Sequence, residues 1–243
     1  MCGAKWYNCG HWIKESLQMV TAIIVAAGKA ERMGSGTDKA FLSLGPRPVV
    51  AWSLMAFEKN TDVDSIILVV RRDQLTAAKA VARMFGISKL RKIVPGGARR
   101  QDSVQAGLKE LDTDTRIVVV HDGARPCVPQ EVISDVIKFA RRGGASVTGQ
   151  RIRDTVKVVE KGVTISQTVD RARYWTVQTP QAFPVAMLRK AYAAVAAEGK
   201  EVFDEAQAVE SIGEQVKICE SDKPNLKITT PEDLQIAAAL LKL

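Results

Sequence analysis

Short apolar runs recur along the first half of the chain, and each one leads into a polar or glycine-containing loop. Residues 21–25, 64–70 and 116–120 are rich in β-branched side chains, which is typical of strands buried on both faces of a parallel sheet. A shorter run at residues 92–94 predicts another strand. We therefore expect the core of the protein to be a sheet of buried strands.

Segments with helical periodicity lie between these strands. Residues 48–59 place Val49, Trp52 and Ala56 on one face, and residues 132–140 repeat this pattern. Further helices are expected at residues 74–85, 184–197, 204–211 and 231–240, and further strands at residues 146–147 and 215–220. The alternation of strand and helix predicts an α/β fold with a Rossmann-like, mostly parallel sheet flanked by helices.

Residues 151–178 depart from this alternation. Polar and β-branched residues alternate there, and Lys161-Gly162 is a candidate hairpin turn. An exposed hairpin leaves unpaired edges unless a second chain covers them. We therefore expect a protruding β-hairpin arm at about residues 151–178 that pairs two copies of the chain into a homodimer.

The composition is that of a soluble globular protein, with 46% hydrophobic and 26% charged residues among 243. This length allows one large α/β domain or two small ones. We expect residues 21–243 to form a single domain and residues 1–20 to form a peripheral N-terminal extension. No apolar run approaches the ~18 residues of a membrane span, and residues 1–20 lack the apolar core of a signal peptide. The expected location is the cytoplasm, without a membrane partner.

The four cysteines are widely spaced and form no CxxC pair. Cys2, Cys9 and His11 could be imagined as metal ligands, but a fourth partner and the usual spacing of a zinc site are missing. We therefore expect free thiols and no metal site in this segment.

The formal net charge is +8, and the cations are dispersed in pairs such as Arg71-Arg72 and Arg141-Arg142. Nucleic-acid-binding proteins usually gather cations on one surface and interleave them with aromatic side chains. Aromatic residues make up only 5% of this chain. A small phosphorylated substrate accounts for the charge equally well, and we expect no nucleic-acid partner.

The loop that follows residues 21–25 combines glycines with cations. Up to residue 39 these are Gly28, Gly34, Gly36, Lys29, Arg32 and Lys39. Backbone N–H groups and positive side chains could converge there on an anion such as a polyphosphate. Ala30 excludes a Walker A loop, which needs Ser or Thr after Gly-Lys, and a dinucleotide fingerprint, which needs glycine at that position. An ordinary strand–helix loop with a solvated charged face remains the alternative.

A second glycine-containing loop is GGARRQDSV at residues 96–104. Its two glycines allow close approach of the backbone to another group. Asp102 or Ser103 can cap the helix expected to run to Leu111. A plain capped loop without a ligand is the alternative.

The strand at residues 116–120 delivers HDGARP to the carboxyl end of the sheet, where ligands bind in open α/β folds. Asp122 suits a ribose hydroxyl or Mg²⁺, and Arg125 suits a phosphate. We expect His121 to have a structural role beside the sheet rather than to act as a base.

Several separated motifs together resemble one family. In chain order they are AAG-x3-RMG…DKAFL, GGARRQDSV, HDGARPCV, RDTVK, TVDR, TPQAF, FDEA and NLKITTPEDL. Over residues 21–243 the chain resembles the 2-C-methyl-D-erythritol 4-phosphate cytidylyltransferases of the non-mevalonate isoprenoid pathway. This resemblance implies a single nucleotidyltransferase domain that transfers CMP from CTP to methylerythritol phosphate and releases pyrophosphate, with Mg²⁺ as cofactor.

The resemblance also implies roles on the nucleotide side of the site. Arg32 and Lys39 match the loop cations that stabilise the transition state at the α-phosphate. Asp122 and Gly123 would contact the ribose side, with Asp122 as the carboxylate nearest the metal. The residues that would approach the CTP and its cytosine are Ala26, Ala27, Gly28, Gly97 and Ser103.

On the acceptor side, the positions that match the methylerythritol phosphate site are Arg125, Thr155, Arg171, Thr179 and Lys227. Thr155 and Arg171 lie in the expected arm, so the resemblance implies that they serve the neighbouring subunit's site. Arg171 and Lys227 count among the catalytic cations. A phosphate monoester has a second pKa of about 6, so its attacking oxygen is anionic at neutral pH and needs no general base.

Two alternatives stay open at this point. A related cytidylyltransferase acts on ribitol 5-phosphate, although Ala27-Gly28 and Ala124 favour the erythritol branch. A non-catalytic nucleotide- or nucleic-acid-binding protein would use the +8 charge instead, although the relevant cations follow strands or lie in glycine loops.

Overall fold

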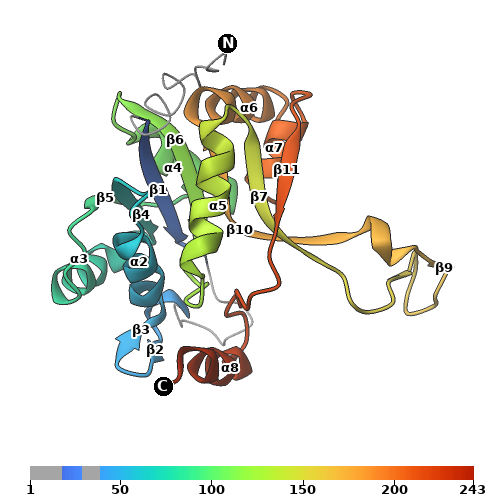
Figure 1. Cartoon of the computed structure of the whole chain (residues 1–243), viewed down its shortest axis with the longest axis horizontal. Coiled ribbons are helices and arrows are strands. Elements are labelled where there is room, and N and C mark those ends of the chain that lie inside the picture. Colours follow the sequence, from blue (N-terminus) through green and yellow to red (C-terminus); the bar gives the residue numbers. More distant parts are fainter. Residues whose placement is uncertain (1–17, 29–38) are drawn as a thin grey trace, which may run out of the picture.

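The structure is a computed structural model that describes residues 18–28 and 39–243. The strands of its central sheet are β1 (Met19–Ala26), β4 (Ser65–Val70), β5 (Leu90–Pro95), β6 (Thr115–Asp122), β7 (Ala145–Arg151), β10 (Trp175–Pro184) and β11 (Val216–Glu220). They lie in the order β11-β7-β10-β6-β1-β4-β5 (Figure 1). All neighbouring pairs are parallel except the two that involve β10, which confirms the predicted mostly parallel sheet.

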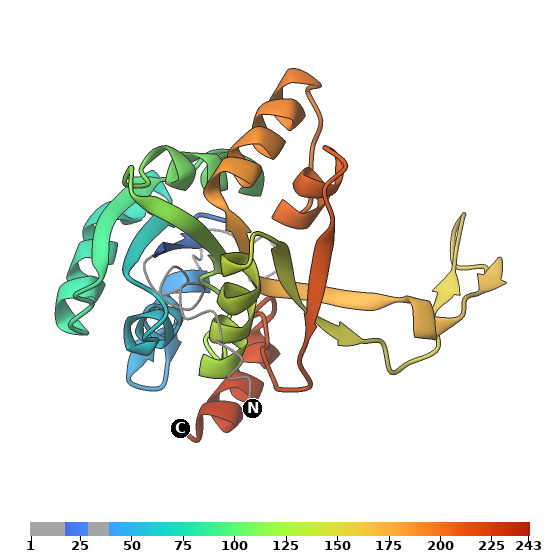
Figure 2. The same ribbon diagram turned by 45° about the horizontal axis from the view of Figure 1, so that its top comes forward.

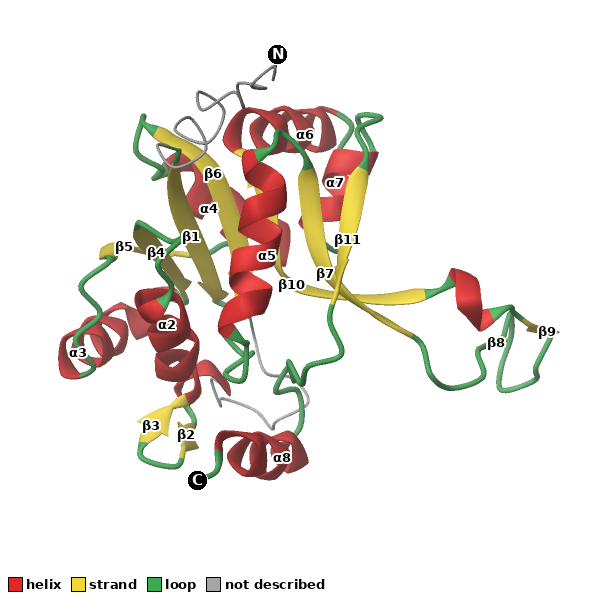
Figure 3. Ribbon diagram, viewed as in Figure 1, coloured by secondary structure: helices red, strands yellow, loops and turns green. Residues whose placement is uncertain are grey.

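Helices cover both faces of this sheet (Figure 3). One face packs against α2 (Val49–Lys59), α3 (Leu75–Met84) and α5 (Gln130–Arg141), and the other against α4 (Arg100–Lys109), α6 (Val185–Ala197) and α7 (Glu205–Glu210). The remaining elements on the domain are η2 (Lys39–Phe41), β2 (Ser43–Leu44), β3 (Arg47–Pro48), η3 (Arg72–Gln74) and α8 (Pro231–Leu241). Within residues 18–28 and 39–243, no helix has the length and apolar character to cross a bilayer.

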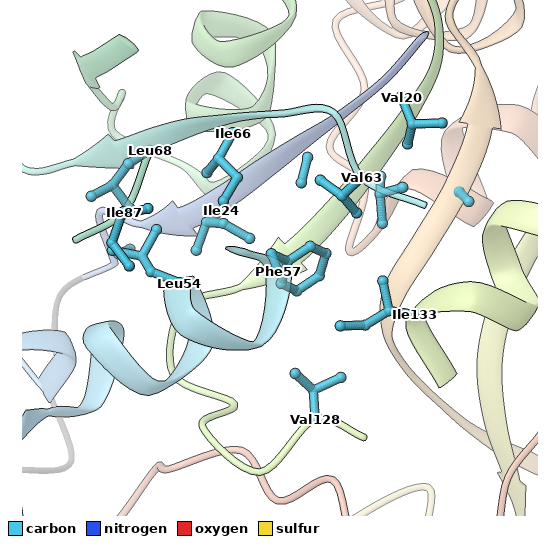
Figure 4. Packing of buried hydrophobic residues seen from close by; sticks show 14 of the residues in the cluster. Val20, Ile24, Leu54, Phe57, Val63, Ile66, Leu68, Ile87, Val128 and Ile133 are labelled. Carbon is cyan, nitrogen blue, oxygen red and sulfur yellow. The ribbon is translucent and has the colours of Figure 1, made fainter. Parts of the chain in front are cut away.

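One hydrophobic core lies on each face of the sheet, because successive side chains of β1 point to opposite faces. Ala22 and Ile24 join the cluster that contains Phe57 of α2 (Figure 4). Ile23 and Val25 join the cluster on the side of α4 and α6. These four residues of β1 are at most 9% exposed, so the strand is buried on both faces as its uninterrupted apolar run predicted.

The first strand begins earlier than predicted. β1 starts at Met19, and Val20 is fully buried and pairs with Ile117 of β6. The Val20 N–H also donates a hydrogen bond to the Asp64 carboxylate at 2.7 Å. The sheet therefore includes the last two residues of the segment expected to be peripheral, while residues 1–17 lie outside the described part of the chain.

Helix α4 begins at Arg100, so neither Asp102 nor Ser103 occupies the capping position proposed from the sequence. Asp102 instead accepts a hydrogen bond from the Arg99 N–H at 3.1 Å, and the Arg99 guanidinium binds the same carboxylate. This reciprocal arrangement caps the helix from within its first turn. The helix also ends earlier than predicted, at Lys109.

Residues 151–178 leave the domain as a protruding arm (Figure 2). Its own elements are short, since β8 (Lys157–Val158) pairs with β9 (Gln167–Thr168), and η4 (Arg171–Arg173) follows. The predicted turn is present, with Gly162 at a φ of 64°. None of residues 151–178 is buried, so the arm has no packed face that would support a longer ladder. The hairpin is present as predicted, and the pairing of two copies through it stays a prediction.

Replacement of Phe57 should reveal how much the α2-side core contributes. Phe57 is fully buried, so Phe57→Ala should lower the free energy of unfolding by about 3–5 kcal/mol through lost burial and a cavity. Urea denaturation measures this loss. Met84→Ala is the matched control, because Met84 is 75% exposed and its truncation should change stability by less than about 0.5 kcal/mol. Equal losses in the two variants would contradict the assignment of this core.

Candidate active site

A pocket lies at the edge of the sheet where the parallel strands β1 and β6 end. This is the edge at which ligands bind in open α/β folds. The small residues expected to approach a nucleotide all line it: Ala26, Ala27, Gly28, Gly97 and Ser103. Its charged lining residues are Lys39, Arg99, Arg100, Asp122 and Lys227. The structure thus brings four separated sequence motifs to one place.

The loop between β5 and α4 requires glycine because it packs tightly on its neighbours. A Cβ atom on Gly96 would lie 2.4 Å from the Cβ of Ala27, and one on Gly97 would lie 2.4 Å from the Cβ of Asp102. Ser103 fastens the loop, since its Oγ accepts from the Gly97 N–H and donates to the Arg99 carbonyl, both at 3.2 Å. The two glycines therefore allow this loop to pack closely on its neighbours, and its approach to a ligand stays a prediction.

Asp122, the last residue of β6, sits among three cations. Its Oδ1 accepts a hydrogen bond from Arg100 Nε at 3.1 Å, while its Oδ2 lies 2.8 Å from Lys227 Nζ and 3.6 Å from Arg125 Nε. Burial acts to raise the pKa of the Asp122 carboxyl, but the positive charges of Arg100, Lys227 and Arg125 outweigh it and hold the pKa far below its ordinary value. Asp122 is therefore ionised at neutral pH.

Lys227 reaches this carboxylate from a segment that is hydrogen-bonded to the chain just after β6. The Ile228 N–H donates to the Ala124 carbonyl at 2.8 Å, and Arg125 Nη1 donates to the Asn225 carbonyl at 2.7 Å. These bonds lie on both sides of Lys227. They hold its backbone at the edge of the sheet, so that its side chain enters the pocket.

His121 is fully buried behind the pocket. Its Nε2 lies 3.3 Å from the Arg125 carbonyl, which can only accept, so Nε2 carries the proton and Nδ1 accepts from the Thr179 hydroxyl at 3.2 Å. The Thr179 oxygen accepts in turn from the Asp122 N–H at 3.0 Å. Burial lowers the pKa of His121 to about 3, so the ring is neutral and structural, as predicted.

Positive charge exceeds negative charge in the lining of the pocket. Its described lining residues include four cations and a single carboxylate, that of Asp122. Two of them also have acidic partners elsewhere, since Arg99 pairs with Asp102 and Arg100 pairs with Glu205. An excess of cations in a concave site raises the local concentration of anions, and it suits phosphate groups in particular.

Metal-binding side chains are scarce in this pocket. Among residues 18–28 and 39–243, no cluster of three or more His, Cys, Asp or Glu side chains is arranged to hold a metal ion. Mg²⁺ is commonly bound through one or two carboxylates together with substrate phosphates. Asp122 supplies one ionised carboxylate, and the neighbouring cations attract phosphate groups. This lining fits a Mg²⁺ ion that is held largely by the phosphates of the substrate.

Comparison with known proteins assigns the chain to one family. A family model described as IspD, 2-C-methyl-D-erythritol 4-phosphate cytidylyltransferase, matches residues 20–243. The chain belongs to this family. A cytidylyltransferase of that name from Alkaliphilus oremlandii is 37% identical over 229 residues, which cover 94% of this chain and 97% of the relative. Another from Bacillus thuringiensis is 40% identical over 223 residues, which cover 92% and 98%.

Solved structures of this cytidylyltransferase family share the whole fold. The 4-diphosphocytidyl-2C-methyl-D-erythritol synthase of Anaerococcus prevotii aligns with a TM-score of 0.83 at 31% identity, covering 95% of this chain and 99% of its own. The Thermus thermophilus cytidylyltransferase aligns with a TM-score of 0.76 at 31% identity, covering 91% and 98%. The predicted family and α/β fold are therefore confirmed.

Three residues assigned from the cytidylyltransferase resemblance do not line the pocket but contact residues that do. Gly123 donates its N–H to the Val25 carbonyl at 2.8 Å, which ties the end of β6 to β1. Arg125 and Thr179 both contact Asp122. Their expected contacts with substrate stay predictions, but all three residues hold the carboxylate in place.

Two assigned residues of the arm are not brought to this pocket by one copy of the cytidylyltransferase chain. Thr155 and Arg171 are exposed on the arm, where the Arg171 guanidinium donates to the Arg153 carbonyl. Arg32 lies outside the described residues. The structure thus assembles the nucleotide half of the expected site more fully than the acceptor half.

The sequence did not assign roles to Arg100 and Glu205, although both lie in motifs of the cytidylyltransferase family. Glu205 is fully buried and binds Arg100 through two hydrogen bonds of 2.7 and 3.0 Å, and it also accepts from the Tyr192 hydroxyl at 2.9 Å. Glutamate is common at the start of a helix because the helix dipole stabilises a negative charge there, so its position in α7 does not indicate a role in the site. No local signal in FDEA marks Glu205, because its partners Arg100 and Tyr192 lie elsewhere in the chain.

Protonation of His121 should make folding sensitive to mild acid. Its pKa of about 3 in the folded protein lies below the ordinary value of about 6.5 expected for the unfolded chain, so protons favour unfolding. The stability is complete above pH 6.5 and should fall by up to about 1.4 kcal/mol per pH unit below it. Urea denaturation between pH 6.5 and 5 should show this slope in the wild type and a smaller one in His121→Gln. Identical slopes would contradict the neutral assignment.

Proposed function

We propose that the protein transfers CMP from CTP to 2-C-methyl-D-erythritol 4-phosphate, giving 4-diphosphocytidyl-2-C-methyl-D-erythritol and pyrophosphate. The observation that carries this proposal is a pocket at the carboxyl edge of the sheet whose lining holds four cations and one ionised carboxylate. Family membership supplies the reaction, since relatives with at least 37% identity carry this name. The protein is accordingly a CTP-dependent nucleotidyltransferase of isoprenoid precursor biosynthesis.

The attacking group in this reaction is a phosphate oxygen of the acceptor. Its second pKa is about 6, so it is already anionic at neutral pH and needs no proton acceptor. The structure agrees with this requirement, because His121 is buried, neutral and bonded on both ring nitrogens. The task of the protein is therefore to bring two anions together and to neutralise charge that develops in the transition state.

Lys39 and Lys227 are the side chains best placed for this task. Both line the pocket, Lys39 from η2 and Lys227 from the segment bonded to the end of β6. In the proposed reaction Lys39, together with Arg32, stabilises the α-phosphate of CTP as pyrophosphate leaves. Lys227 and Arg125 hold the phosphate of the acceptor, while Ala26, Gly28, Gly97 and Ser103 surround the nucleotide.

Mg²⁺ belongs to the same proposal. Asp122 would hold it together with the phosphates of CTP, and the ion would supply charge neutralisation at those phosphates. The low pKa of the Asp122 carboxyl keeps this side chain negatively charged at neutral pH. Lys227 would then bind two anions, the Asp122 carboxylate and the acceptor phosphate.

A homodimer would complete the acceptor half of the site. Thr155 and Arg171 lie on an arm that has no buried residues and that extends away from its own domain. We propose that they reach the pocket of a second copy. Exposed apolar side chains on the arm, including Val163 at 95% and Ile165 at 57%, would then be covered by the partner.

We further propose a cytoplasmic location, with neither nucleic acid nor a membrane as partner. Both proposed substrates are small, charged and water-soluble. The cations that define the site are gathered in a pocket instead of along an extended surface.

Lys39→Ala should lower kcat by about 10² to 10³-fold while the fold is retained, because one transition-state cation is removed. Pyrophosphate release with CTP and Mg²⁺ is measured with methylerythritol phosphate and, separately, with ribitol 5-phosphate. Lys59→Ala, at the exposed end of α2, is the control and should keep full activity. Preference for ribitol 5-phosphate would replace the proposed acceptor, and an inactive wild type would favour a binding protein.

Mixing two inactive variants tests the shared site. Lys39→Ala removes the nucleotide-side cation of a subunit's own pocket, whereas Arg171→Ala removes the arm cation offered to its neighbour. Half of the dimers formed after subunit exchange would be mixed, and each would contain one intact site, so about a quarter of wild-type activity should return. Restoration should increase with incubation time and require both proteins. No restoration, in a mixture whose exchange is verified, would place Arg171 outside the neighbour's site.

A further inference from the structure

Glu205 is a fully buried carboxylate that lies outside the pocket yet is connected to it. It is the first residue of α7, and its side chain is 0% exposed. A buried carboxylate is strongly unfavourable unless both of its oxygens are hydrogen-bonded. Here Oε1 accepts from Arg100 Nη1 at 2.7 Å and from the Tyr192 hydroxyl at 2.9 Å, and Oε2 accepts from Arg100 Nη2 at 3.0 Å.

Arg100 connects this carboxylate to the pocket. One N–H of each terminal nitrogen is directed at Glu205, which fixes the orientation of the guanidinium, and its Nε donates to Asp122 Oδ1 at 3.1 Å. The other oxygen, Oδ2, stays with Lys227 at 2.8 Å. The geometry therefore divides Asp122 between two cations, one on each oxygen.

Without Glu205 this division would not be favoured. A guanidinium prefers to bind a carboxylate through two parallel N–H bonds. Arg100 also lies at the start of α4, where the helix dipole disfavours a cation. Without Glu205 it would lack the partner that compensates its charge there. Its nearest remaining carboxylate is Asp122, and a two-bond contact there would compete with Lys227 for Oδ2.

We propose that Glu205, supported by the Tyr192 hydroxyl, is a positioning residue that orients Asp122 and Lys227 for the reaction by holding both terminal nitrogens of Arg100. Glu205 touches no substrate in this arrangement and acts through Arg100. The inference rests on the proposed function, since it assigns Asp122 and Lys227 to the binding of phosphate and metal. It also explains why a hydrogen-bonded network extends from the pocket to Tyr192 of α6 and Glu205 of α7.

Coupling between Glu205 and Asp122 tests this role. Glu205→Gln should lower kcat/KM for CTP by about 10- to 100-fold, and Asp122→Asn should lower it at least as much. If Glu205 acts through Asp122, the double variant should resemble Asp122→Asn alone, because residues that act as a unit are not additive. A purely structural role predicts that the two losses multiply, and that result would overturn the proposal.

Two further variants keep the test decisive. Asp62→Asn is the matched control, because Asp62 also pairs with an arginine, Arg141, at 2.7 Å but far from the pocket, and its loss should leave kcat and KM unchanged. If Glu205→Gln does not fold, Tyr192→Phe removes a single hydrogen bond to the same carboxylate. It should lower kcat/KM for CTP about two- to fivefold, and only when Asp122 is present.

The same set of variants is measured for CTP dissociation by calorimetry. An inactive wild type would count against the proposed reaction, whereas coupling in the dissociation constant would still be visible if CTP binds. An active wild type with additive losses in both kinetics and binding would overturn only the role of Glu205.

Discussion

The ionised carboxylate of Asp122 is the charge on which the arrangement of the site depends. Three cations from different parts of the chain converge on it, from α4, from the loop after β6 and from the segment that contains Lys227. Each of them is drawn from water into a crowded edge of the sheet, which is costly for a charge without a partner. The carboxylate makes their convergence possible, and it thereby concentrates positive charge where phosphates are expected.

Much of this architecture follows from local patterns in the sequence. Uninterrupted apolar strands such as residues 21–25 have to be buried on both faces, which requires a parallel sheet covered by helices on each side. Parallel strands end at one edge, so the loops after β1, β5 and β6 necessarily meet there. That geometry is sufficient to predict that Gly28, Gly97 and Asp122 share a pocket, and the structure places all three in its lining.

Other features could not be read locally, because they depend on contacts between distant segments. Arg100 and Glu205 are 105 positions apart, and nothing in either motif states that they form an ion pair. The sequence suggests Asp102 as a helix cap, yet Asp102 lies inside the first turn and forms a capping box with Arg99, the residue before the helix. The alternating pattern of the arm predicted regular strands, but alternation stabilises a ladder only where one face is packed, and here residues 151–178 have no buried face.

The exposed arm has a consequence for how the protein can evolve. Exposed side chains of the arm can change with little effect on folding, so sequence drift there is limited by what the arm touches. The nucleotide pocket is under the opposite constraint, since Gly96 and Gly97 leave no room for even a methyl group. In the proposed shared site, a lineage could therefore alter the arm's contribution to acceptor binding in single steps, while the half that handles the nucleotide stays unchanged. Such separation would let one scaffold explore new acceptors without first losing its stability.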